Sequence, residues 1–336
     1  MAPLFSCPAS VKRVDFSFSA HIAFMTQDHW TSYWREGPVS SFGEQTPEWY
    51  ESRLLPFWVR TFEAQEMGST ILDLATGNGA VTRIAADVNR RQDKKFRLLA
   101  VDRVPTTAPE GVELLPNMPL EELDTGLEAD LVTSQFGLEY SRLELSLPRL
   151  PSILKPSGRL VMVAHHRDSV LSDNSRLELR EYRAVLSDEP LFERMEKLLR
   201  VMGSPKTAAE RQRLQRNKAA QSARLAVNRS ISKLTGRFHD GLVIAHLLQQ
   251  LSPLFQQGMP RPVDEKLHYL AQVRRDLKRA RQRLNDQIAA ALDDTAVEKL
   301  KNLAAQQSLN STRTERLETD DGHLLAWVLA FSKPDS

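Results

Sequence analysis

The sequence contains very little cysteine and no long hydrophobic run. Cys7 is its only cysteine, so one chain alone can form no disulfide framework, zinc cluster or redox thiol pair, and we expect no metal site. No run of about 18 apolar residues is present, which predicts no membrane span. Residues 1–24 lack a sustained apolar core followed by a cleavage motif, which argues against a signal peptide. These absences fit a cytoplasmic protein.

The composition is that of a folded protein. The 336 residues are 41% hydrophobic and 26% charged, which is enough for one large or two ordinary domains. The net charge of +2 does not by itself indicate nucleic acid. Met25 opens a sequence that reads like a natural start, so we expect residues 1–24 to be a disordered extension or untranslated. A short ordered arm is the alternative.

Apolar strand-like runs alternate with helix-like runs over residues 46–166. An amphipathic helix is expected at Thr46–Met67, kinked near Pro56, and another at Leu143–Leu154. Such alternation predicts a parallel sheet covered by helices on both faces. Asp321-Gly322 near the carboxyl end indicates a hairpin. The strands are expected at Thr70–Ala75, Phe96–Val101, Val112–Leu115, Asp130–Ser134, Arg159–Ala164, Thr312–Glu318 and His323–Phe331, with a helix at Ala80–Asn89.

Residues 169–311 differ in character from the rest. Leu, Ala, Arg, Gln and Glu dominate, which predicts a large helical insertion between the fifth and sixth strands. A coiled-coil-like seam of apolar residues within it could form a homodimer. The seam consists of Leu270, Val273, Leu277, Ala280, Leu284, Ile288 and Ala291.

A glycine turn follows the first predicted strand. Gly77 and Gly79 would let the backbone approach a ligand closely, and the next helix would point its amino terminus at the same place. Asp102 ends the second strand, where a carboxylate can hold the hydroxyls of a ribose. Asp73 could brace the turn.

These features resemble the class I S-adenosylmethionine (SAM)-dependent methyltransferases, in particular the ubiquinone/menaquinone C-methyltransferase-like branch. Residues 73–79, DLATGNG, are similar to the family's first motif, with Ala75 in place of its first glycine. Asn117-Met118 are similar to the segment that holds adenine after the family's third strand, and residues 129–137 are similar to its fourth motif. Residues 154–160, LKPSGRL, are similar to its L-K-P-G-G-x-L turn, with Ser157 in place of a glycine.

The resemblance covers about residues 45–166 and 312–332, and it implies a fold and a cofactor. The implied fold is an α/β, Rossmann-like doubly wound sheet, mostly parallel with an antiparallel last strand. Residues 25–168 and 312–336 would form the SAM-binding domain, and residues 169–311 a helical cap, oligomerisation or substrate region. The residues implied to bind SAM are Asp73, Ala75, Thr76, Gly77, Asn78, Gly79, Asp102, Arg103, Asn117, Met118, Gln135 and Phe136.

A dinucleotide is the rival cofactor. Its G-x-G-x-x-G fingerprint needs a third glycine where this chain has Thr82. The spacing therefore favours SAM.

No residue is marked unambiguously as catalytic. His165 and His166 follow the fifth strand, and either could act as a general base or merely cap that strand. Glu139 and Tyr140 could line the acceptor pocket or begin a helix. The aromatic stretch Trp30, Tyr33, Trp34 and Phe42 could cover the cofactor or pack on the sheet.

Basic residues cluster in the helical region. Residues 206–237 hold nine Lys or Arg against one acid, and residues 261–283 hold eight against three. Such clusters fit an RNA partner or a solvated helix face, and few aromatic residues are present to stack bases.

We expect a SAM-dependent methyltransferase, with a small molecule as the first choice of acceptor and RNA as the second. A non-catalytic SAM-binding interaction protein is the third reading.

Overall fold

The computed structural model describes residues 29–37, 47–104, 107–123, 126–255 and 261–335. The predicted extension at residues 1–24, and Phe42, lie outside these ranges. The described chain divides into two compact units, one formed by residues 176–284 and the other by the segments before and after them.

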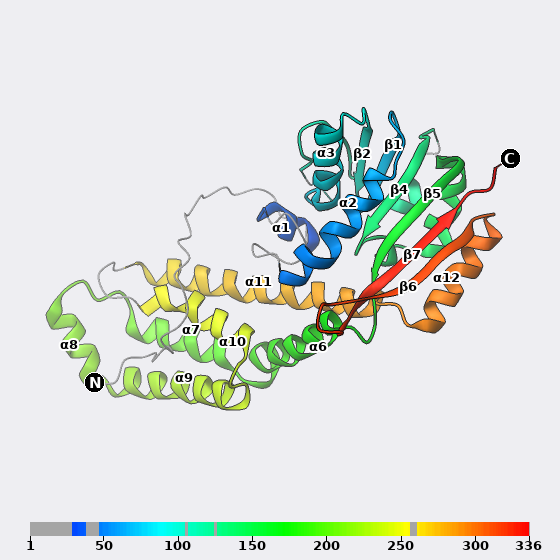
Figure 1. The fold of residues 1–336 in the computed structure, drawn as a ribbon. Coiled ribbons are helices and arrows are strands. Elements are labelled where there is room, and N and C mark those ends of the chain that lie inside the picture. Colours follow the sequence, from blue (N-terminus) through cyan, green and yellow to red (C-terminus); the bar gives the residue numbers. More distant parts are fainter. Residues whose placement is uncertain (1–28, 38–46, 105–106, 124–125, 256–260, 336) are drawn as a thin grey trace. The chain divides into compact units, whose positions relative to one another are not determined.

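The unit that surrounds the insertion contains one seven-stranded sheet, coloured from blue through green to red in Figure 1. Its strand order is β3-β2-β1-β4-β5-β7-β6, with β1 to β5 parallel and β7 antiparallel to both of its neighbours. The Rossmann-like doubly wound fold and the terminal hairpin are thereby confirmed. The strands are β1 (Thr70–Leu74), β2 (Arg97–Asp102), β3 (Val112–Pro116), β4 (Ala129–Gln135), β5 (Leu154–His165), β6 (Asn310–Glu318) and β7 (Leu324–Ser332).

Helices cover both faces of the sheet because successive strand residues alternate between faces. Leu72 and Leu74 pack in one apolar cluster with α5 (Leu150–Ile153) and α12 (Asp294–Gln306). Ile71 packs in the other cluster with α2 (Leu55–Glu63) and α3 (Ala80–Gln92).

Two predicted helices differ from the structure because of proline. The first begins as a π-helical turn, η1 (Tyr50–Leu54), and Pro56 lies in the first turn of α2, where its missing N–H costs nothing. The Leu143–Leu154 helix is broken into α4 (Leu143–Ser146), η4 (Leu147–Arg149) and α5, because Pro148 and Pro151 interrupt it. Short 3₁₀ turns also occur at η2 (Leu120–Glu122) and η3 (Leu138–Tyr140), and a short helix at α1 (His29–Arg35).

The predicted break at residues 155–158 lies inside β5. Ser157 has a φ of 60°, and a register shift occurs between Ala129 and Leu131 on the neighbouring strand. The turn residues therefore form an irregular start to the strand.

The helical unit has its own apolar core. Leu270, Val273 and Leu277 are buried in this core, so these three seam residues pack against their own chain. Ala291 is buried as well, which leaves Ala280, Leu284 and Ile288 of the seam for the predicted homodimer. The helices are α6 (Val170–Arg183), η5 (Ala184–Asp188), α7 (Leu191–Met202), α8 (Ala208–Arg216), α9 (Lys218–Arg237), α10 (Leu242–Leu251), η6 (Ser252–Phe255) and α11 (Val263–Ala290). The first residues of α6 and the last residues of α11, from Asn285, belong to the unit that contains the sheet.

The compact helical unit is smaller than the predicted insertion at 169–311. Val297, Leu300 and Ala304 of α12 are buried in the sheet's core, which places this helix with the sheet. Among the described residues, no helix is long and apolar enough to cross a membrane.

Candidate functional site

The turn after β1 has the tight geometry that the glycines predict. Ala75, Gly77 and Gly79 have φ values of 52°, 56° and 80°, all in the left-handed region. The N–H of Thr76 donates to the carbonyl of Val101 at 3.0 Å, which ties the turn to β2. Ala75, the departure from the family motif, thus adopts the conformation that favours glycine.

Asp102 joins the ends of β1 and β2. Its Oδ2 accepts a hydrogen bond from the N–H of Gly77 at 2.8 Å, and its Oδ1 accepts one from the N–H of Val104 at 3.0 Å. Burial raises the pKa of the Asp102 carboxyl, and backbone donors from Val104, Gly77 and Arg103, together with the charge of Arg103, oppose that rise. A carboxylate has about four acceptor sites, so Asp102 can still accept from a ligand hydroxyl.

Asp73 is buried in β1, opposite Thr133 of β4. The hydroxyl of Thr133 donates to Asp73 Oδ1 at 2.7 Å. Burial raises the pKa of Asp73 to about 7, with a further contribution from the charge of Asp102. Thr133 was not singled out from the sequence, although a threonine within an apolar strand is a usable signal.

A cavity of about 430 Å³ opens at the carboxyl ends of β1, β2 and β4. This volume is within the range of small-molecule sites, which runs from about 300 to about 1,000 Å³. Its lining includes Ala75, Asp102 and Arg103 on the side of β1 and β2. Phe136, Glu139 and Tyr140 line the side that follows β4. The edge of the parallel strands is where ligands bind in sheets of this kind.

The loops after β1 and β4 approach each other closely. A Cβ added to Gly137 would lie 2.7 Å from the Cβ of Ala75, so only glycine fits there without a shift. Phe136, the preceding residue, has a φ of 52° and lines the cavity. Residues 134–137, SQFG, therefore shape the wall of the cavity and also end β4.

Helix α1 contributes aromatic side chains to the same cavity. Trp30 and Trp34 line it, and their rings stack with centroids 6.4 Å apart. The Trp34 indole covers Gly77, where an added Cβ would lie 2.6 Å from the ring. The side-chain amide of Asn78 donates to the carbonyl of Trp34 at 2.9 Å, which fixes α1 on the glycine turn.

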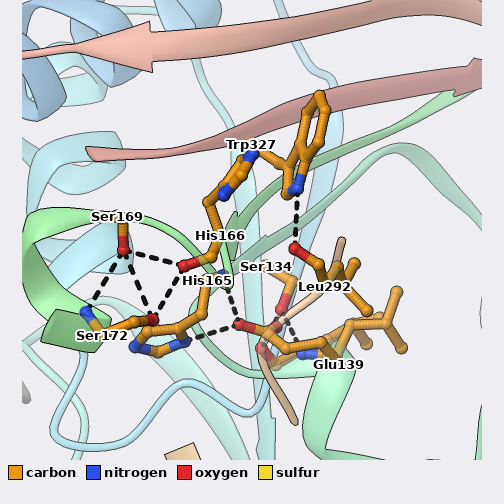
Figure 2. A network of polar contacts seen from close by, with 10 residues as sticks. Ser134, Glu139, His165, His166, Ser169, Ser172, Leu292 and Trp327 are labelled. Carbon is orange, nitrogen blue, oxygen red and sulfur yellow. Dashed lines mark hydrogen bonds and ion pairs between the residues drawn. The ribbon is translucent and has the colours of Figure 1, made fainter. Parts of the chain in front are cut away.

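Glu139 and His165 form a buried pair next to the cavity (Figure 2). Glu139 Oε1 accepts from the backbone N–H of His165 at 3.0 Å and lies 2.8 Å from His165 Nδ1. A hydrogen shared between Glu139 Oε1 and His165 Nδ1 therefore joins the two side chains. The His165 ring lies 4.3 Å from that of Phe136 and 5.7 Å from that of Tyr140.

His166 lies on the opposite face of β5, as strand alternation requires. Its ring stacks on Trp327 at 4.6 Å, and its Nδ1 accepts from the N–H of Asp168 at 3.0 Å. Its carbonyl accepts from the hydroxyls of Ser169 and Ser172, as Figure 2 shows. Burial lowers the pKa of His166. The two predicted histidines therefore do not share one site, and neither of them is among the residues that line the two described cavities.

Other predicted residues take positions around the cavity. Gln135, with Asp73 and Thr76, lines a smaller cavity of about 40 Å³ that shares Ala75 and Phe136 with the larger one. Gln135 Oε1 also accepts from Trp58 Nε1 at 2.6 Å.

Asn117 and Met118 line neither cavity within the described chain. Leu120 and Glu121, which follow them, line the larger one instead. The N–H of Met118 donates to the carbonyl of Asp102 at 2.9 Å, so the predicted adenine segment supports the site from behind.

Asp286 also lines the larger cavity, although no sequence motif pointed to it. It lies at the end of α11, far along the chain from the motifs. Its Oδ2 accepts from Trp30 Nε1 at 3.1 Å and lies 2.6 Å from His29 Nε2. This carboxylate thereby links α11 to α1 beside the cavity.

Comparison with protein-family models found no match, and comparison with curated proteins found none either. Solved structures with similar folds include S-adenosylmethionine-dependent methyltransferases. One from Mesorhizobium loti is 21% identical, with a TM-score of 0.27, and the match covers 33% of this chain and 53% of that one. The N1-methyltransferase of 1,6-didemethyltoxoflavin from Burkholderia thailandensis, solved with S-adenosylhomocysteine, is 13% identical, with a TM-score of 0.35, covering 89% of this chain and 94% of that one.

A third similar structure comes from a Haloferax volcanii complex between the Trm112 methyltransferase activator and a methyltransferase. It is 18% identical, with a TM-score of 0.33, and the match covers 42% of this chain. This chain spans 62% of that chain's length. The C-methyltransferase-like branch has no counterpart among these three and stays a prediction.

Proposed function

We propose that this chain binds SAM at the carboxyl edge of its sheet and transfers the methyl group to a small molecule, releasing S-adenosylhomocysteine. The observation that carries the proposal is the Gly77–Asp102 contact beside the 430 Å³ cavity. It places a left-handed glycine turn and a buried carboxylate side by side at the end of adjacent parallel strands. The sulfonium supplies a methyl group that is already electrophilic, so the protein's task is to align the acceptor and exclude water.

The residues of the site fit this cofactor. Asp102 would hold the ribose hydroxyls, and Arg103, Leu120 and Phe136 would border the adenosyl group. Asp73 and Thr76 line the smaller cavity, and both are buried. Their polar side chains would meet a polar end of the cofactor. The third glycine of a dinucleotide site is replaced by Thr82, which is buried in α3 and bonded to the carbonyl of Gly79.

Ion pairs within the helical region favour a small acceptor over RNA. Within the predicted basic stretch, Lys233 pairs with Glu189 and Arg237 pairs with Asp188. These pairs reduce the positive charge left for a phosphate backbone. The buried Glu139–His165 pair is a hydrogen-bonded carboxylate and imidazole beside the cavity, and these are side-chain types that serve acid–base catalysis, which favours catalysis over simple SAM binding.

The function is tested by incubating the full chain with methyl-labelled SAM and the small-molecule fraction of a cell extract. We expect label to enter a low-molecular-mass product, with an equal amount of S-adenosylhomocysteine released. Label that enters RNA from the same cells, and does so less readily at higher salt, would instead support the RNA alternative. Binding of SAM without any transfer to either fraction would support the non-catalytic alternative.

A further inference from the structure

A run of cations without acids begins in α8 and continues along α9 (Figure 1). Between Glu210 and Asp240 the chain contains eight Lys or Arg and no Asp or Glu. The ion pairs of Lys233 and Arg237 neutralise cations at the carboxyl end of α9 only. They leave the charge of α8 and of the amino-terminal part of α9 to be explained.

Five cations in this part of the run are exposed and unpaired. They have neither an ion-pair partner nor a side-chain hydrogen bond within the described part of the chain. Glu210, the acid before the run, accepts from the backbone N–H groups of Lys206 and Thr207. The charge of Arg213 acts on Glu210 as well. We call the five cations the basic surface, and they are Arg211, Arg213, Arg216, Lys218 and Arg229.

Helix stability does not account for the basic surface. The helix dipole favours Arg213 and Arg216 in the last turn of α8, but the two lie three residues apart, a spacing at which like charges repel. Lys218 lies in the first turn of α9, where the dipole disfavours a cation and no acid is present. A helix face that only meets solvent typically carries charges of both signs. The basic surface therefore fits an anionic partner.

The basic surface is open to such a partner on both helices. No residue of α8 is buried. On α9, Ala223 and Val227 pack in the core of the helical unit. Lys218 and Arg229 lie about three turns apart on the other face, and the exposed Ser222 lies between them. The cations of α9 thus point away from the core.

The side chains around the basic surface indicate the class of partner. Gln212, Gln215 and Ser222 are exposed, and with Arg and Lys they are the side chains that contact phosphate oxygens in nucleic acids. Leu225 is the one large hydrophobic side chain exposed between residues 211 and 229. A protein partner or a membrane would need a larger apolar face.

The form of the nucleic acid follows from a second feature of the run. Residues 211–237 contain no Phe, Trp or Tyr, so they offer no ring on which the bases of a single strand could stack. Contacts to phosphates alone suit a duplex, whose bases are already stacked on one another.

We propose that the basic surface binds double-stranded nucleic acid through its phosphates, without reading the base sequence. Each cation that contacts a phosphate releases a bound counterion, so the affinity falls steeply as the salt concentration rises. The duplex is a docking partner and not the methyl acceptor. Its binding is therefore separate from the proposed methyl transfer to a small molecule.

The proposal is tested by fluorescence anisotropy with the full chain and a short labelled duplex, made once as RNA and once as DNA. The test variant carries Arg211→Gln, Arg213→Gln and Arg216→Gln together, which changes no buried side chain. We expect the wild type to bind both duplexes at low salt. The variant should bind at least about tenfold more weakly, and its slope of log affinity against log salt should be shallower by about 2 to 3.

The matched control carries Arg90→Gln, Arg200→Gln and Lys301→Gln. It loses the same charge, but from cations that are already paired with a carboxylate on their own helix. It should bind the duplexes nearly as the wild type does, and circular dichroism should show that both variants are folded. An equal loss of affinity in the control would overturn the proposal by assigning the binding to net charge.

Three further results would overturn the proposal. The first is no binding of either duplex by the wild type at low salt. The second is tighter binding of a single strand than of the duplex. The third is binding to vesicles that contain phosphatidylglycerol with no binding to either duplex, which would assign the basic surface to a membrane.

Discussion

At the scale of single residues, two buried acids make this site polar. Asp73 and Asp102 lie at the ends of neighbouring strands, where a core of this kind would otherwise be apolar. Each is held by hydrogen bonds from its surroundings, Asp73 by Thr133 and Asp102 by Gly77. Burying a carboxyl group costs stability unless the group is hydrogen-bonded or paired. Two buried carboxyl groups at one edge of the sheet are therefore the strongest local evidence for a ligand site.

Asp73 makes the stability of the chain depend on pH. Its folded-state pKa is raised to about 7 by burial, above the unfolded value of about 3.9. Its contribution to stability is therefore fully present below about pH 4 and is lost as the pH rises through 7. We expect the stability of the wild type relative to Asp73→Asn to fall with rising pH across this window, by up to about 1.4 kcal/mol per pH unit.

Urea unfolding of both proteins without SAM, at several pH values from about 5 to about 8, measures this effect. Asp93→Asn is the control, because Asp93 is exposed, and its difference from the wild type should vary little over the same range. A difference between wild type and Asp73→Asn that does not change with pH would show that Asp73 does not titrate there.

At the scale of elements, the contact between α1 and the turn after β1 decides what can enter the site. The ring of Trp34 lies over Gly77, and the side-chain amide of Asn78 donates to the carbonyl of Trp34, which attaches α1 to the turn. The absence of a side chain at Gly77 thus allows a left-handed φ and also leaves room for the Trp34 indole.

We expect Gly77→Ala to destabilise the chain more than Gly111→Ala. Both positions have positive φ, which costs alanine about 1–2 kcal/mol. An added Cβ at Gly111 meets nothing within 4 Å, whereas at Gly77 it would lie 2.6 Å from Trp34. The excess cost at Gly77 should therefore largely disappear in a Trp34→Ala background.

Thermal unfolding of the single and double variants separates the two costs. If Gly77→Ala and Gly111→Ala are equally destabilising, or if Trp34→Ala does not reduce the excess, then α1 does not rest on the turn as described.

The elements of the sheet could be predicted from the sequence because their signals are local. The first strand is marked by a short apolar run that contains one acid, Asp73, and the hairpin is marked by Asp321-Gly322. The carboxyl edge of the sheet, with Gly77 and Asp102 together, follows from strand order alone.

The other features of the candidate site could not be predicted from the sequence, because they depend on contacts between segments that are distant in the chain. Asp286 reaches the cavity from the end of a long helix, and no pattern near it differs from an ordinary helix surface. Which of His165 and His166 packs against Phe136 depends on the register of β5 with its neighbouring strands. The predicted adenine segment lies beside the cavity wall, where Leu120 and Glu121 take its place.

At the scale of the whole molecule, the two compact units have separate apolar cores. A ligand that binds one unit stabilises that unit by mass action, by about 2.7 kcal/mol when the free ligand is 100 times its Kd. We expect SAM to slow amide hydrogen exchange in β1, α3 and β4, and to leave α7 and α9 nearly unchanged. The helical unit would then be a module that SAM does not order.

Hydrogen exchange monitored by mass spectrometry, with and without SAM, tests this expectation across the chain. Comparable protection of α7 and α9 would show that SAM acts on the helical unit too.

The most direct test of the central claim is a calorimetric titration of SAM into the wild type and into Asp102→Asn. We predict saturable binding at one site in the wild type, and binding weaker on the order of 10- to 100-fold in Asp102→Asn, because an amide accepts ribose hydroxyls less strongly than a carboxylate. Saturable binding of NAD with no binding of SAM, or equal SAM affinity in both proteins, would contradict it.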